Sequence, residues 1–167
     1  MCINRSSEHR FGSIDLPDAS VRRYDKQCDD ASIFFVESHN TGDSMIHSPG
    51  FLEAVRDAKT RVRENTPEDV KRKQAAGESF YFIDVREDNE WNRGHAAGAI
   101  HLSKGIIERD VETAIPDRDA EIVLYCGGGF RSALAADALQ KMGYTNVISM
   151  DGGWKRWNEL RYPVERD

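Results

Sequence analysis

The most informative segment of this chain is Glu121-Ile122-Val123-Leu124-Tyr125-Cys126-Gly127-Gly128-Gly129-Phe130-Arg131-Ser132. The residues before Cys126 form an apolar run of strand length, and an amphipathic segment follows the glycines. This pattern predicts a strand, a tight glycine loop and the start of a helix, with a thiol as the first loop residue. The glycines let the backbone turn sharply and leave no side chain over the sulfur.

A cysteine in this setting is predicted to be reactive. Consecutive loop amides can form an anion-binding nest, and the helix N-terminus behind them adds a positive dipole end. Such surroundings favour the thiolate, which is the nucleophilic form of cysteine. A lone cysteine at a strand end is otherwise usually a small buried hydrophobe, but the glycine loop reverses that expectation. We therefore expect Cys126 to be catalytic. The predicted substrate-binding residues are those of the loop: Gly127, Gly128, Gly129, Phe130, Arg131 and Ser132.

Two loop side chains leave alternatives open. Arg131 could pair with a substrate anion or with an acidic neighbour. Ser132 could hydrogen-bond to the sulfur or cap the helix.

The remaining chain alternates strand and helix patterns. Strands are predicted over 80–85, 99–102, 121–125 and 146–150. Helices are predicted from Ser48-Pro49, from Thr66 to near Gly77, over 87–93 and 106–114, from the loop to Gly143, and after Gly152-Gly153. This alternation predicts an α/β fold with a mostly parallel central sheet and helices on both faces. Sites in such folds lie beyond the carboxyl ends of the strands, so Asp84 is expected near Cys126.

Composition limits the function further. The chain has 167 residues and a net charge of −6, which argues against nucleic-acid and anionic-membrane partners. Its cysteines, Cys2, Cys28 and Cys126, are too widely spaced for a disulfide framework or a zinc site. The first residues lack the apolar core of a signal peptide, so we expect a reducing cytoplasmic location. Residues 1–45 are polar and aperiodic, and we expect a poorly ordered N-terminal arm.

Several motifs together resemble a single-domain rhodanese, of the thiosulfate sulfurtransferase family. They are Ile83-Asp84-Val85-Arg86 with Glu90-Trp91, Gly94-His95-Ala96-Ala97-Gly98-Ala99-Ile100-His101-Leu102, the Cys126 loop, and Asp151-Gly152-Gly153-Trp154. The resemblance covers roughly residues 66–164, and Ala97 departs from it, since rhodaneses commonly have proline there. It implies a rhodanese-like domain over 46–167 that carries an N-terminal helical extension.

The resemblance also implies an activity. Cys126 would take a sulfane sulfur from thiosulfate or a similar donor, hold it as a persulfide, and pass it to cyanide or a thiol, with no metal or organic cofactor. A sulfur-relay module acting with a partner protein would use the same residues. Asp84 and Arg86 are predicted to support the loop as an ion pair. His95 is expected to be a structural histidine rather than a general acid.

A neighbouring enzyme class is the alternative. Rhodanese-fold phosphatases and arsenate reductases have a loop longer by one residue, which suits a tetrahedral oxyanion gripped by the arginine. Here four residues separate Cys126 from Arg131. This shorter loop suits a single sulfur atom on cysteine, so sulfur transfer is the favoured prediction.

Overall fold

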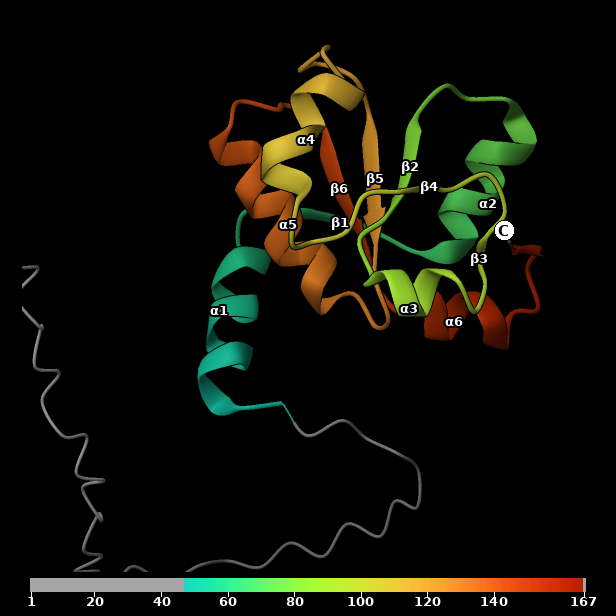
Figure 1. Cartoon of the computed structure of the whole chain (residues 1–167), viewed down its shortest axis with the longest axis horizontal. Coiled ribbons are helices and arrows are strands. Elements are labelled where there is room, and N and C mark those ends of the chain that lie inside the picture. Colours follow the sequence, from blue (N-terminus) through green and yellow to red (C-terminus); the bar gives the residue numbers. More distant parts are fainter. Residues whose placement is uncertain (1–46, 167) are drawn as a thin grey trace, which may run out of the picture. The chain divides into compact units, whose positions relative to one another are not determined.

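The computed structural model describes residues 47–166 (Figure 1). The N-terminal arm predicted over residues 1–45 lies outside the described residues, as do Cys2 and Cys28. The organisation of the chain into an arm and a domain with a helical extension therefore stays a prediction.

The described residues form an α/β fold around a parallel sheet, as predicted. Its five strands lie in the order β1-β6-β5-β2-β4. Their bounds are β1 Arg63–Asn65, β2 Tyr81–Asp84, β4 Ile100–His101, β5 Ile122–Tyr125 and β6 Val147–Met150. A second, two-stranded antiparallel sheet pairs β3 (His95–Ala96) with β7 (Val164–Glu165). In the register of the large sheet Asp84 lies opposite Tyr125, so the carboxyl ends of β2 and β5 are level.

Helices cover both faces of the sheet (Figure 1). Their bounds are α1 Pro49–Lys59, α2 Pro67–Ala76, α3 Asp88–Trp91, α4 Ile107–Ala114, α5 Phe130–Lys141 and α6 Gly153–Glu159. Helices α4 and α5 lie on one face and α2 and α6 on the other, while α1 packs against α5. This layered arrangement buries both faces of the central strands.

Alternate residues of strand β5 pack into two hydrophobic cores, one on each face of the sheet. Ile122 and Leu124 pack into the core beneath α4 and α5, in the cluster that also holds Cys126. Val123 and Tyr125 alternate to the opposite face and pack beside Trp157 of α6. All of β5 is buried, which explains a continuous apolar run instead of polar alternation.

The ends of helices α1 and α2 are set by capping residues that can be recognised in the sequence. The Ser48 hydroxyl accepts from the Phe51 amide at 3.4 Å, and a proline takes the first helical position of α1. Thr66 and Asp69 form the reciprocal capping box of α2. That helix ends at Gly77, which has the left-handed φ of 68° that glycine tolerates.

Some elements differ from expectation. Strand β1 was not predicted, because Arg63–Asn65 is polar and lies at the edge of the sheet. Strands β3 and β7 are too short to leave a periodic signal. Helix α5 buries more than one face, because α1 covers its outer side. There the Arg61 guanidinium donates to the buried Asp137 carboxylate at 2.9 Å.

Candidate functional site

The Cys126 loop joins β5 to α5 at the carboxyl edge of the sheet. Cys126 directly follows the strand, and its residue is only 2% exposed. The Gly129 amide donates to Sγ of Cys126 at 3.2 Å. Because α5 begins at Phe130, the amides of its first turn have no intrahelical partners. The predicted strand–loop–helix geometry is therefore present, and one amide already contacts the sulfur.

Two backbone amides of helix α6 hydrogen-bond to carbonyls of the Cys126 loop. The Trp154 amide donates to the Cys126 carbonyl at 2.7 Å, and the Lys155 amide donates to the Gly127 carbonyl at 2.9 Å. In a trans peptide the next N–H lies opposite the carbonyl, so the amides that follow point away from α6. Gly153 permits this approach, since a Cβ there would lie 2.3 Å from the Cys126 carbonyl oxygen.

Ser132 lies in the first turn of α5, with its hydroxyl close to the sulfur. Its hydroxyl is 3.7 Å from Sγ of Cys126 and 2.9 Å from the Ser149 hydroxyl. Gly129, with a φ of 98°, occupies the N-cap position of α5. Of the two alternatives for Ser132, the geometry favours a contact with the sulfur. Ser149, at the buried end of β6, is an additional residue of the site that the apolar strand pattern did not reveal.

Arg131 pairs with an acidic neighbour. Its two terminal nitrogens donate to Glu90 at 2.6 and 2.9 Å, and Glu87 lies 4.0 Å away. The hydrogen bonds from Arg131 lower the pKa of the Glu90 carboxyl, and Glu90 in turn raises the pKa of Arg131. Both side chains are about one-third exposed. Glu90 stands in one of the motifs noted in the sequence, but nothing in that motif identified its partner.

Asp84 and Arg86 form a buried ion pair. The Arg86 guanidinium donates to Asp84 at 2.6–3.0 Å and to the Gly94 carbonyl at 2.8 Å. Its carbon lies 4.4 Å from the centre of the Trp154 ring. The Trp154 amide donates to the Cys126 carbonyl. The Asp84–Arg86 pair is therefore connected to the loop through contacts with Trp154. This arrangement supports a scaffolding role for both residues.

Two other groups near the ion pair have structural surroundings. Tyr125 is buried, and burial followed by the Asp84 charge raises the pKa of its phenol. Its hydroxyl accepts from the Ala96 amide at 3.0 Å. His95 is buried with its ring stacked on Trp91 at a centroid distance of 3.4 Å. Neither group is brought to the sulfur.

A cavity of about 440 Å³ opens at the loop. Its lining residues are His47, Phe51, Glu90, Gly127, Gly128, Phe130 and Arg131. The glycines leave the loop backbone bare on this side, as the sequence predicted. Phe51 lies in the first turn of α1 and His47 just before that helix, and neither was predicted as a site residue. The apolar spacing of α1 marks Phe51 as a core position and carries no sign of the loop.

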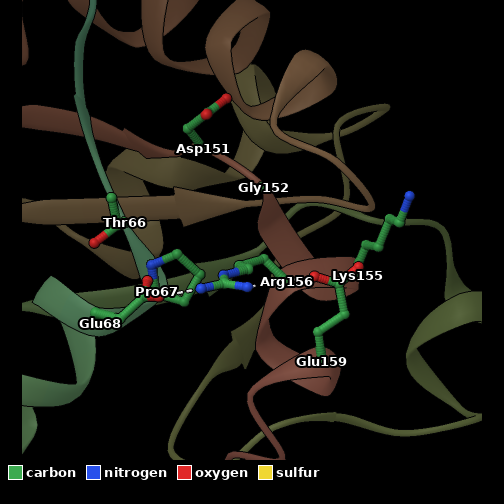
Figure 2. A pocket seen from close by; sticks show the side chains of 8 residues that line it. All are labelled: Thr66, Pro67, Glu68, Asp151, Gly152, Lys155, Arg156 and Glu159. Carbon is green, nitrogen blue, oxygen red and sulfur yellow. Dashed lines mark hydrogen bonds and ion pairs between the residues drawn. The ribbon is translucent and has the colours of Figure 1, made fainter.

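A second cavity, of about 460 Å³, lies beyond β1 and β6 and shares no lining residue with the cavity at the loop. Its lining residues are Thr66, Pro67, Glu68, Asp151, Gly152, Lys155, Arg156 and Glu159 (Figure 2). Its charged groups are largely paired: Arg156 contacts Glu68 at 2.8 Å and Glu159 at 3.6 Å. Asp151 is held by Lys59 at 3.0 Å.

Within residues 47–166, no group of three or more histidine, cysteine or acidic side chains is placed to hold a metal ion. Over the same residues, no helix has the length and apolarity that crossing a membrane requires.

Comparisons with known proteins agree with the geometry. "Putative sulfurtransferase YtwF" of Bacillus subtilis is 35% identical over 96 residues, which are 58% of this chain and 90% of the relative. Thiosulfate sulfurtransferase GlpE of Shewanella oneidensis is 35% identical over 81 residues, 48% of this chain and 78% of that protein.

A solved structure from Rhodopseudomonas palustris has a TM-score of 0.66 and 27% identity, and covers 74% of this chain and 100% of its own. It is described as a "Protein of Unknown Function RPA3614, Possible Tyrosine Phosphatase". The model of the rhodanese-like domain matches residues 66–160, which is more than half of the chain. These residues contain the Cys126 loop, the Asp84–Arg86 pair and the α6 residues that hold the loop. The chain therefore belongs to the rhodanese-like domain family.

Proposed function

We propose that this chain transfers a sulfane sulfur from thiosulfate, or a similar donor, to a thiophilic acceptor through a persulfide on Cys126. The observation that carries the proposal is the Gly129 amide, 3.2 Å from Sγ at the N-terminus of α5. A sulfur held there lies among donors that favour an anion. The relatives named as sulfurtransferases support sulfur transfer as the general chemistry.

The proposed reaction has two balanced steps. In the first, the Cys126 thiolate attacks the outer sulfur of thiosulfate, a new S–S bond forms, and sulfite leaves with the electron pair of the broken bond. In the second, cyanide or a thiolate attacks the outer sulfur of the persulfide. The Sγ–S bond breaks, its electron pair returns to Cys126, and thiocyanate or a new persulfide departs.

The residues around Cys126 take supporting roles in this proposal. Backbone amides of the loop from Gly127 to Ser132 stabilise the outer persulfide sulfur, and the Ser132 hydroxyl contacts Sγ. Asp84 and Arg86 keep the loop in place through Trp154. The chemistry needs no cofactor, because both steps exchange one S–S bond for another bond to sulfur.

Phosphate chemistry is the second candidate, and the description of the Rhodopseudomonas palustris structure is the observation in its favour. Two features of this chain oppose it. Only four residues separate Cys126 from Arg131. Arg131 would have to bind phosphate oxygens through its two terminal nitrogens, and both of these nitrogens already donate to Glu90. Hydrolysis of an aryl phosphate that is lost in Cys126→Ser would reverse this ranking.

Intact mass after incubation with thiosulfate and desalting tests the proposal. We expect a gain of one sulfur atom that cyanide reverses, with thiocyanate released in equal amount. Cys126→Ser should show no gain, while Cys2→Ser and Cys28→Ser should behave as the parent protein. Equal gains in the Cys126→Ser variant would reject Cys126 as the carrier.

A further inference from the structure

Three aromatic rings form one wall of the cavity at the loop. His47 and Phe51 lie 4.9 Å apart between ring centroids, and Phe130 lies 5.2 Å from His47 and 6.2 Å from Phe51. All three residues are partly exposed, and all three line the cavity. We call this set the aromatic wall. Because its rings face a cavity and remain accessible, it is an apolar surface that a ligand can cover.

The cavity is also lined by two charged side chains that neutralise each other. Arg131 and Glu90 line the cavity and bind each other through two hydrogen bonds. Glu87, at 4.0 Å from Arg131, adds a second carboxylate beside them. Since both terminal nitrogens of Arg131 already donate to Glu90 and Glu87 adds a further negative charge, these groups give an additional anion little attraction.

We propose that the aromatic wall is the acceptor site. It selects thiols that carry an aromatic or bulky apolar group and no charged group besides the sulfur. This inference rests on the proposed function, because it assigns the acceptor of the Cys126 persulfide. The acceptor thiolate attacks the outer sulfur, its S–S bond forms, and the Sγ–S bond breaks with its electrons returning to Cys126. The product is the persulfide of the apolar thiol.

The size and lining of the cavity fit such a ligand. Its volume, about 440 Å³, falls within the range of roughly 300–1,000 Å³ typical of small-molecule sites. Gly127 and Gly128 border it without side chains, so a thiol whose apolar group rests on the wall can bring its sulfur to the loop. Cyanide is too small to use the wall.

The aromatic wall is supplied partly from outside the segment that defines the family. His47 and Phe51 precede residues 66–160, which match the family model, whereas Phe130 lies within them. Phe51 also lies outside the two buried core clusters of the described residues. The acceptor preference is therefore a property of how α1 sits beside α5 in this chain.

The test compares two alkyl thiols of similar basicity, phenylmethanethiol and 2-mercaptoethanol, as acceptors of thiosulfate sulfur. Matched basicity removes differences in intrinsic nucleophilicity, so the ratio of their kcat/KM values reports the apolar group. We expect the parent protein to prefer phenylmethanethiol. In Phe51→Ala the preference should fall by roughly threefold to tenfold, the size of an aromatic contact. Phe51→Leu should keep most of it.

Tyr81→Ala serves as the matched control, since Tyr81 is an exposed aromatic residue at the amino end of β2. It should leave the ratio unchanged. An equal loss for both thiols in Phe51→Ala, or equal kcat/KM values in the parent protein, would overturn the inference. The mass gain on Cys126 is a separate readout: if it is absent, the proposed function fails, and if it is present without a thiol preference, only the acceptor site fails.

Discussion

Replacing Glu90 by glutamine tests what Arg131 can do when its partner loses its charge. In the parent protein the carboxylate holds both terminal nitrogens of Arg131, at 2.6 and 2.9 Å. Glutamine has nearly the same shape and can still accept from the Glu87 amide, as Glu90 does at 3.3 Å. The substitution removes one negative charge beside the loop and leaves the guanidinium available to an incoming dianion.

The expected gain is modest, because the pair is not deeply buried. The side chains of Arg131 and Glu90 are 29% and 31% exposed. Exposed pairs couple by about 0.2–1 kcal/mol, so folding stability should change little. A charge-assisted hydrogen bond is worth about 1.5–3 kcal/mol when desolvated. Discounted for exposure, we expect about 0.7–1.4 kcal/mol toward thiosulfate, which is a roughly threefold to tenfold higher kcat/KM.

The assay is thiosulfate:cyanide sulfurtransfer at several ionic strengths. The gain in Glu90→Gln should shrink as salt screens the freed charge. Glu68→Gln is the control, since it makes the same charge change and removes a similar pair with Arg156, at 2.8 Å, outside the loop. The double variant Glu90→Gln/Arg131→Gln should lose the gain. An unchanged or lower kcat/KM in Glu90→Gln would show that Arg131 does not attract the donor.

Three further substitutions test the scaffold. Asp84→Asn removes the charge that balances buried Arg86, and it should lower the free energy of unfolding by about 3–5 kcal/mol; an unchanged urea midpoint would contradict the buried pairing. The pKa of Asp137 is held low by its basic neighbours, so its stabilisation is present above about pH 4 and lost as pH falls through the lower folded-state pKa. Asp137→Asn should therefore flatten the acid side of the stability profile measured in urea, and an equally steep profile would count against this. Gly153→Ala places a Cβ 2.3 Å from the Cys126 carbonyl oxygen at a φ of 48° and should lose about 2 kcal/mol or more; wild-type stability in thermal melts would show that α6 can move away.

Features with local causes could be predicted from the sequence. The capping box at Thr66 and the left-handed end at Gly77 depend on residues within one turn of each other. The β5 strand and the start of α5 follow from an apolar run next to glycines, which restricts the local backbone to few choices. Cys126 was placed correctly at the loop for the same reason.

Features that depend on distant partners could not be predicted. Whether Arg131 faces a ligand or a carboxylate is settled by where α3 places Glu90. Phe51 has the spacing of a core residue on an isolated helix, and only the packing of α1 on α5 turns it toward the loop cavity. The polar strand β1 has no apolar pattern, because its pairing with β6 uses backbone groups at the edge of the sheet.

The pairing of β1 with β6 decides how far the chain can be shortened. Residues 66–160 match the family model, yet a protein trimmed to them would lack β1 and expose the hydrogen-bonding edge of β6. An open edge of this kind, from the apolar strand Val147–Met150, invites pairing between chains and aggregation. The three polar residues Arg63–Asn65 thus protect the edge of β6, and we expect a segment that begins after them to aggregate more readily than the longer chain.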